Sequence, residues 1–502
     1  MTEVLSAADA GWLHMDRPTN LMVINCVLLF DQPVDWGRLK GVIEERLVER
    51  YPKFRQRVID SRLPLRPARW ADDPEFRLEH HLHHVALPAP GDTATLQQLV
   101  GELMAVPLDR NRPLWQAIMV DGFGTGTALI VRMHHCIADG ISLARVMLSL
   151  TDSTPDTGTV GVADDPAQPP ATGPLGRIPL PGSGLLTGVA RGSSAVAREL
   201  VHAARSPGYA VSLAGAAQRN ASATAKLLLT SADAATPIKG RPGVSRRVAW
   251  TGASSLAEVK RVAHDNQTTV NDVLMAAVSG ALRSYLQSRG GPAREIQAVV
   301  PFNLRPLDEP VPRELGNRFG LVLVPLPVGV SGASRRLTEI HKRMREMKVS
   351  GEGAAAYALI SGLGRGPEAV ERRVVGWWTG KGTLVMTNVP GPSETVYLAG
   401  APVGTALIWA PTSGDLALSV SIFSYRGQVT VGVMSDATLV PDPDKIAAET
   451  ERQLEQLEST LRRYGAYGRD RTGDEAPQRI RPRPGQAAQA RPLGGDGERR
   501  RR

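Results

Sequence analysis

Cysteine is nearly absent from this sequence. Among its 502 residues only Cys26 and Cys136 occur, which excludes a disulfide framework and a CxxC metal site. The first ten residues lack the apolar segment of a signal peptide. No run of about 18 apolar residues occurs, so no segment is predicted to span a membrane. We therefore expect a cytoplasmic protein in a reducing compartment.

Excess positive charge is scarce outside the C-terminal end. The formal net charge is +9, but residues 462–502 contain twelve arginines against five acidic residues. The remaining chain is therefore close to neutral, which argues against a surface that reads nucleic acid. We expect no nucleic-acid partner. We also predict that the arginine-rich end is disordered, because it has too few apolar residues to form a core.

Length and composition predict two domains. A chain of this length exceeds the size at which a single core forms. Residues 1–150 and 241–462 each alternate predicted strands and helices, which is typical of α/β domains. Between them, residues 151–240 form a predicted Pro/Gly-rich linker with bridging helices, and 463–502 form the arginine-rich tail. The strands with the clearest pattern are Leu21–Phe30, Trp115–Val120, Thr127–His135 and Thr383–Thr387, and the helices are Trp36–Tyr51, Ile141–Leu150 and Val270–Gln287.

Two histidines stand at the end of the predicted strand Thr127–His135. Side chains alternate between the faces of a strand, so His135 shares a face with Val131 and Met133. His134 lies on the other face, with Arg132. A histidine at the end of an apolar row is desolvated and still reachable, which suits a neutral imidazole that acts as a general base.

Less specific interpretations fit the same residues. A buried histidine is more often a hydrogen-bonded core residue than a catalyst. Asp139, before Gly140 and an apolar helix, fits an N-cap. His134, His135 and Asp139 also fit a facial metal triad. The sequence has no HExxH segment and no further cluster of ligand residues, so we expect no metal.

Several motifs together resemble one family. The segment HHCIADG at His134–Gly140 is similar to the HHxxxDG motif of acyl-CoA-dependent acyltransferases, a superfamily that includes chloramphenicol acetyltransferases and nonribosomal condensation domains. Five further segments resemble, in the same order, those of the bacterial wax ester synthase/diacylglycerol acyltransferase family. They are Arg112–Trp115, Val270–Val273, Val300–Arg305, Leu315–Gly320 and Thr387–Pro392.

The resemblance implies a fold and a mechanism. The fold would be two chloramphenicol-acetyltransferase-like α/β domains with the active-site channel between them. His135 would be the general base, with His134 supporting the motif. Asp139 would orient the loop through a structural ion pair, and Gly140 would allow close backbone approach or a positive φ. Acyl-CoA would be a substrate, and we expect no cofactor.

Residues of the second half are predicted to complete the site. On the helix Val270–Gln287, Asn271 lies along an apolar stripe. There it is either a satisfied core residue or a donor to the developing oxyanion. The neighbouring Asp272 would support the motif. Candidates for lining the passage of CoA and the acyl chain are Thr387, Asn388, Ser419 and Ser421.

The resemblance implies an O-acyltransferase that moves a long-chain acyl group from acyl-CoA to diacylglycerol, to a long-chain alcohol, or to both. Such an acceptor is a lipid alcohol, so we expect peripheral association with a membrane or lipid-droplet surface. Two alternatives remain open. One is an acyltransferase or condensation-type enzyme of secondary metabolism, and the other is a weakly catalytic protein that binds lipid surfaces.

Overall fold

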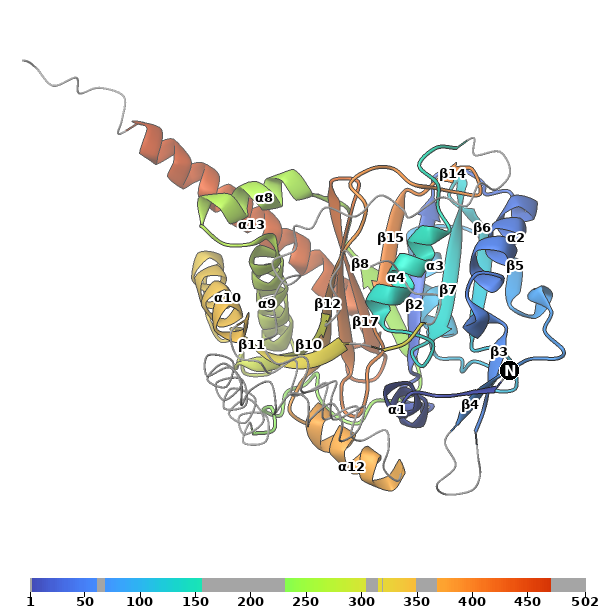
Figure 1. Cartoon of the computed structure of the whole chain (residues 1–502). Helices are drawn as coiled ribbons and strands as arrows, with labels where there is room; N and C mark the ends of the chain where they lie inside the picture. Colours follow the sequence, from blue (N-terminus) through green and yellow to red (C-terminus); the bar gives the residue numbers. More distant parts are fainter. Residues whose placement is uncertain are drawn as a thin grey trace, which may run out of the picture. The chain divides into compact units, whose positions relative to one another are not determined.

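Five strands form the sheet that carries the two histidines in the computed structural model (Figure 1). The structure describes residues 2–60, 68–155, 231–303, 315–317, 319–348 and 368–470. The strand order is β15-β2-β7-β6-β5. These strands are β2 (Val23–Phe30), β5 (Leu82–Ala86), β6 (Trp115–Phe123), β7 (Gly126–His134) and β15 (Thr405–Trp409). Every residue of the central strand β7 is buried, which accounts for its nearly continuous apolar sequence.

The edge strand β15 comes from the second half of the chain. It pairs antiparallel with β2, with Ile408 opposite Cys26. The limits predicted for the two domains, 1–150 and 241–462, are therefore not the limits of the sheets. One strand of the later segment completes the sheet of the earlier one, and residues 1–458 form one compact unit.

The second sheet has the order β11-β10-β12-β16-β17-β8, and the short strand β9 also pairs with β17. Strands β10, β12 and β16 run parallel, and the other pairs are antiparallel. The strands are β8 (Arg246–Trp250), β9 (Ser254–Ser255), β10 (Ile296–Asn303), β11 (Phe319–Leu326), β12 (Leu384–Pro390), β16 (Leu418–Tyr425) and β17 (Gln428–Asp436).

Helices cover both sheets. In Figure 1, α8 (Leu256–Asp265), α9 (Val270–Ser288) and α10 (Ala333–Lys348) lie on the same side of the second sheet. Helix α9 is buried along most of its length, which explains its run of alanine and other small apolar residues. The other α-helices in the described residues are α1 (Ala7–Met15), α2 (Trp36–Ile43), α3 (Thr93–Met104), α4 (Gly140–Ser149), α12 (Glu368–Thr379) and α13 (Pro443–Asp470). A π-helical turn at Glu44–Val48 follows α2, and short 3-10 helices occur at Pro52–Phe54 and Leu78–His80.

Two small sheets complete the part of the fold that the structure describes. One has the order β1-β4-β3 and the other pairs β13 with β14. Their strands are β1 (Thr2–Val4), β3 (Gln56–Ile59), β4 (Arg69–Asp72), β13 (Tyr397–Leu398) and β14 (Ala401–Pro402).

The α/β fold class predicted from the sequence is confirmed, and so are the long strands and helices of both halves. Helix α13 continues to Asp470, so the predicted tail boundary at 463 falls inside a helix. The bridging helices predicted within 151–240 and the tail beyond Asp470 lie outside the described residues. Within the described part, no helix is both long and apolar enough to cross a membrane.

Candidate active site

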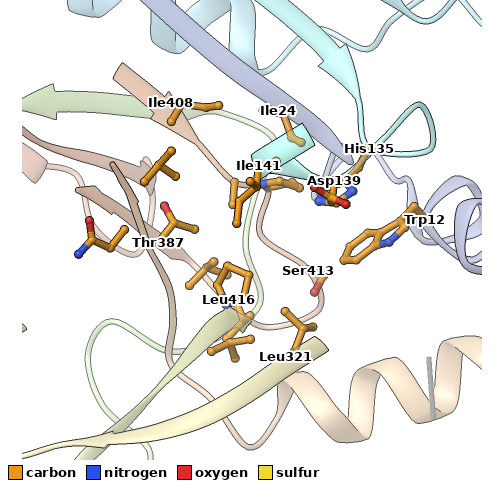
Figure 2. Close-up of a pocket in the computed structure, with 18 of the residues that line it drawn as sticks. Trp12, Ile24, His135, Asp139, Ile141, Leu321, Thr387, Ile408, Ser413 and Leu416 are labelled. Atoms are coloured by element: carbon orange, nitrogen blue, oxygen red, sulfur yellow. The ribbon is translucent and has the colours of Figure 1, made fainter. Parts of the chain in front are cut away.

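An apolar cavity lies between the two halves of the first compact unit (Figure 2). Trp12, His135 and Asp139 line it from the N-terminal half. The opposite wall comes from the second sheet and the segments beside it, and Leu321, Thr387 and Leu416 are among its residues. Ile24, Ile141 and Ile408 also line the cavity. The predicted channel between the halves therefore has a counterpart in the structure.

His135 follows the last residue of β7 and still belongs to the pairing with β2. Its backbone N–H donates to Met22 O at 2.7 Å. The side chain is 5% exposed and lines the cavity. The imidazole stacks on Trp12, with ring centroids 4.1 Å apart and planes at 18°. The alternation of the strand thus places His135 at the cavity, as predicted.

Asn317 fixes the tautomer of this imidazole. The Asn317 Nδ2 group donates to Asp9 Oδ1 at 2.7 Å and to the backbone oxygen of His135 at 2.8 Å. With its donors used in this way, the amide presents Oδ1 to His135 Nδ1 at 3.0 Å. An amide oxygen only accepts, so Nδ1 carries the proton. The lone pair therefore resides on Nε2, the nitrogen that would act as a base.

A buried ion pair supports Asn317 from behind. Asp9 lies at the N-terminus of α1, and its carboxylate is 3.4 Å from Lys53 Nζ. Asp9 also accepts from the backbone N–H of Asn317 at 3.2 Å. Lys53 lies over the ring of Trp70, at 5.0 Å from its centroid. Because all of these groups are buried, the carboxylate is held by fixed partners rather than by water.

The surroundings of His135 keep its imidazole neutral. Burial lowers the pKa of His135 to about 4, and the negative charge of Asp139 partly opposes this effect. Burial penalises the charged imidazolium more than the nearby carboxylate stabilises it. At neutral pH the ring is therefore unprotonated and can accept a proton.

Asp139 is the N-cap of α4. Its Oδ1 accepts from the backbone N–H of Ser142 at 2.8 Å, which satisfies one of the donors that a helix leaves unpaired at its start. The N-cap interpretation is therefore confirmed. The structural ion pair predicted for Asp139 stays a prediction.

Gly140 follows Asp139 and lines the cavity. Gly140 does not have a positive φ, so the predicted positive φ is wrong. A Cβ at this position would meet only Ile24 Cδ1, at 3.9 Å. The small residue therefore leaves space in the cavity, rather than allowing an unusual backbone conformation.

His134 points away from the cavity. Its Nδ1 accepts from the backbone N–H of Cys136 at 3.1 Å, and its Nε2 lies 3.8 Å from Asp16 Oδ2. The ring is buried and lies outside the cavity lining. These contacts fit the supporting role predicted for His134.

Asn271 is buried on α9 but does not line the cavity. Its Oδ1 accepts from Asn388 Nδ2 at 2.9 Å, and its own Nδ2 lies 3.2 Å from Met275 Sδ. These contacts agree with the alternative of a satisfied core residue, and the oxyanion contact of Asn271 stays a prediction, with Asn388 between Asn271 and the cavity lining. Asp272 closes a capping box with Thr269 and lies 2.8 Å from His341 Nδ1, so it holds α9 and α10 together.

The four predicted passage residues separate into two pairs. Thr387 and Asn388, on β12, line the cavity. Ser419 and Ser421, on β16, do not. Ser419 Oγ donates to Ala410 O at 2.9 Å and Ser421 Oγ donates to Ile408 O. Their hydroxyls bind the backbone at β15 and join the two sheets, so neither serine contributes to this cavity, and their place along a CoA passage stays a prediction.

Sequence reasoning missed Trp12, Asn317 and Asp9. Asn317 falls within the segment Leu315–Gly320 that the resemblance had marked, which was the one available signal. In the part of the chain that the structure describes, no three His, Cys, Asp or Glu side chains gather as metal ligands. The described site offers one neutral base with a fixed tautomer beside an apolar cavity, an arrangement that suits proton removal from a hydroxyl that enters with a hydrophobic chain.

Known proteins resemble this chain along most of its length. The sequence pattern of the wax ester synthase/diacylglycerol acyltransferase catalytic domain matches residues 5–274, and that of the C-terminal domain of the same proteins matches residues 315–458. A putative diacylglycerol O-acyltransferase of Mycobacterium tuberculosis is 30% identical over 480 residues, which cover 90% of each chain. A probable diacylglycerol O-acyltransferase of the same species is 28% identical, over 91% of this chain and 96% of the relative.

Solved structures show the same fold. The wax ester synthase/diacylglycerol acyltransferase of Marinobacter aquaeolei superposes with a TM-score of 0.63 at 23% identity, covering 91% of this chain and 99% of that one. The first condensation domain of the calcium-dependent antibiotic synthetase superposes with a TM-score of 0.56 at 18% identity, covering 91% and 96%. The fold that the resemblance implies is thereby confirmed.

Proposed function

Because the chain belongs to the wax ester synthase/diacylglycerol acyltransferase family, we propose that it is an acyl-CoA-dependent O-acyltransferase with His135 as its general base. The observation that carries the proposal is the buried, neutral imidazole of His135. Its Nδ1 is held by Asn317 and it lines the apolar cavity.

The reaction needs one base. A hydroxyl has a pKa of about 15.7 and attacks a thioester poorly while it keeps its proton. His135 Nε2 takes this proton as the hydroxyl oxygen forms a bond to the thioester carbon. The carbon–sulfur bond then breaks, and the thiolate of CoA takes the proton from Nε2. A thiol pKa of roughly 8.5 makes this a good leaving group, so no covalent acyl-enzyme is required.

The neighbours of His135 support this step. Asp139 places a negative charge near the ring, which favours the imidazolium that forms during the attack. Trp12 stacks on one face of the imidazole and keeps it in place. Proton transfer thus occurs on a ring whose tautomer, plane and charge are set before substrate arrives.

The lining of the cavity supports a long-chain substrate. Apolar side chains such as Ile24, Leu321 and Leu416 bury hydrocarbon favourably and offer few partners to a polar chain. The two mycobacterial relatives are named diacylglycerol O-acyltransferases. The donor proposed is therefore a long-chain acyl-CoA, and the acceptor is diacylglycerol, a long-chain alcohol, or both.

Such acceptors reside in membranes or lipid droplets, so the proposal includes peripheral association with their surface. Support comes from the sequence, because the arginines of residues 462–502 would be attracted to anionic lipid.

An acyl-transfer assay tests the proposed function. The full chain is mixed with acyl-CoAs of several lengths and with diacylglycerol, hexadecanol or water as acceptor, and both thiol release and ester formation are measured. Ester formed faster from long-chain than from short-chain acyl-CoA supports the proposal. Thiol release with water alone, or ester formed only with a small polar alcohol, contradicts it.

A further inference from the structure

One hydroxyl in the apolar wall of the cavity lacks a partner. Val385, Thr387 and Val389 alternate along β12 and all line the cavity. Threonine has nearly the shape of valine, so a third valine would fill the same space. Instead, Thr387 is 7% exposed and its Oγ1 makes no hydrogen bond to any described group. A buried hydroxyl without a partner destabilises the folded protein, which indicates that something else uses it.

Nearby hydroxyls on β16 and just before β12 are satisfied. Thr383 Oγ1 donates to Asp233 Oδ2 at 2.6 Å, and Ser419 Oγ donates to Ala410 O at 2.9 Å. Among the described residues, Thr236 also has a buried hydroxyl without a partner, but Thr236 does not line the cavity. Thr387 therefore combines an unsatisfied hydroxyl with access to the space that substrate would occupy.

The position of Thr387 decides which substrate group would reach it. Figure 2 shows Thr387 on the wall opposite His135 and Asp139. The hydroxyl of an acceptor must lie at His135 to lose its proton. A long-chain alcohol has no other polar group, so it leaves Thr387 unsatisfied. A diacylglycerol carries ester carbonyls a few bonds from its hydroxyl, and a carbonyl oxygen accepts the hydrogen bond that a threonine donates.

The wall around Thr387 favours an ester over the pantetheine arm of CoA. Pantetheine carries several amide and hydroxyl groups, each of which needs a partner when buried. Val385 and Val389, which lie on either side of Thr387 on the same face of β12, provide none, and the Nδ2 group of Asn388 already donates to Asn271 Oδ1. An ester has one strong acceptor between hydrocarbon chains, which matches the one buried hydroxyl of β12 that lacks a partner.

We propose that Thr387 is a specificity-determining residue that donates a hydrogen bond to an ester carbonyl of an acylglycerol acceptor. Through this bond the enzyme prefers acylglycerols to long-chain alcohols. The proposal rests on the proposed O-acyltransferase function and names its acceptor class.

The test compares two substitutions in the full chain. Thr387→Val keeps the shape and removes the donor, and Thr387→Ser keeps the donor. With palmitoyl-CoA, kcat/KM is measured for dioleoylglycerol and for hexadecanol. We expect Thr387→Val to lower the ratio of these constants about tenfold, the loss typical of one hydrogen bond. Thr387→Ser should keep the ratio within about twofold. Thr338→Val, which makes the same change at an exposed position of α10, is the control.

Thermal unfolding separates this effect from misfolding. Because Thr387→Val removes an unsatisfied hydroxyl, its Tm should equal or exceed that of the natural chain. An unchanged ratio overturns the proposal. An equal decrease of kcat/KM for both acceptors, together with a higher KM for palmitoyl-CoA, also overturns the proposal. In that case Thr387 would contact the pantetheine arm of CoA. If the natural chain acylates neither acceptor, the proposed function itself fails, which differs from an active enzyme whose ratio is insensitive to Thr387.

Discussion

The Nδ1 atom of His135 lies 3.0 Å from Oδ1 of Asn317, a residue 182 positions further along the chain. His135 belongs to the first sheet, whereas Asn317 shortly precedes β11 of the second. The tautomer of the proposed base is therefore set by a residue of the other half. The two halves must therefore pack correctly against each other before His135 has the tautomer that the proposed reaction needs.

Replacing Asn317 should change the pH dependence of the reaction as well as its rate. Asn317→Ala removes the acceptor of the Nδ1 proton, so kcat should fall by roughly 10²-fold through the wrong tautomer and a misplaced ring. Asn317→Asp adds a negative charge beside the imidazole and should move the acid limb of the pH–rate profile to higher pH. An acid limb that stays in place in Asn317→Asp would show that Asn317 has only a structural role.

His135→Ala should lower turnover by roughly 10²- to 10⁴-fold, because the proton acceptor is lost. His134→Ala should cost less, since His134 supports the backbone at Cys136 and does not line the cavity. Single-turnover acyl transfer and circular dichroism are measured for both variants. A well-folded His135→Ala protein with full activity would contradict the mechanism.

The depressed pKa of His135 predicts an activity that persists in mild acid. Because burial lowers this pKa to about 4, the base stays neutral throughout the range from pH 8 to pH 5. We expect kcat/KM to be nearly constant over that range and to fall only below it. A midpoint near the ordinary histidine pKa, about 6.5, would show that the ring is hydrated rather than buried.

The same pKa predicts how stability depends on pH. Between the unfolded pKa of about 6.5 and the folded pKa, the unfolded chain binds one more proton at this residue than the folded chain. The His135 contribution to the free energy of unfolding is therefore complete above the unfolded pKa and decreases as the pH falls toward 4. Urea unfolding of the natural chain and of His135→Ala at several pH values isolates this contribution. If the free energy of unfolding changes with pH to the same extent in both proteins, this contribution of His135 is contradicted.

Substitutions of Asp139 should distinguish its role as the N-cap of α4 from the effect of its negative charge on His135. Asn is as good an N-cap as Asp, so Asp139→Asn should keep most of the stability that the bond to Ser142 provides. Its activity should still fall, because the negative charge that favours the imidazolium of His135 is gone. Asp139→Ala should lose activity and, in addition, about 1 kcal/mol of stability. A large fall in Tm for Asp139→Asn would instead support the predicted structural ion pair.

Truncation after Asp470 tests the proposed surface attachment without cutting α13. The removed segment contains nine arginines and four acidic residues. Sedimentation with anionic vesicles should weaken, and binding of the full chain should decrease steeply with salt. Transfer to a water-soluble short-chain alcohol should not change. If vesicle binding survives truncation, the folded body makes the contact, and Trp377, which is 41% exposed, is the next residue to replace.

Local patterns were sufficient to predict the α/β fold class and the orientation of the two histidines, whereas the role of His135 as a base came from the resemblance. Alternation along β7 depends only on neighbouring residues, so it placed His135 at the end of an apolar row and His134 on the other face. Helical periodicity likewise placed Asn271 along a buried stripe of α9. It could not show that Asn388, 117 positions away, occupies the Asn271 amide oxygen.

Contacts between distant segments account for most of what the sequence did not reveal. Asp9 reaches Asn317 across 308 positions, and no local pattern marks either residue as a partner. The serines of β16 illustrate the same point. Their alternation placed them together on one face, but which segment would cover that face depended on β15 entering the other sheet.

The position of β15 also has a consequence for the order of events during synthesis. When the ribosome has translated the first half, β2 still exposes the backbone edge that Thr405–Trp409 will cover. This edge of the nascent sheet must stay unpaired until residues 405–409 have left the ribosome, close to the end of the compact unit 1–458. A fragment that ends before β15 should therefore self-associate through β2, and a synthetic peptide of residues 405–409 should compete with that association.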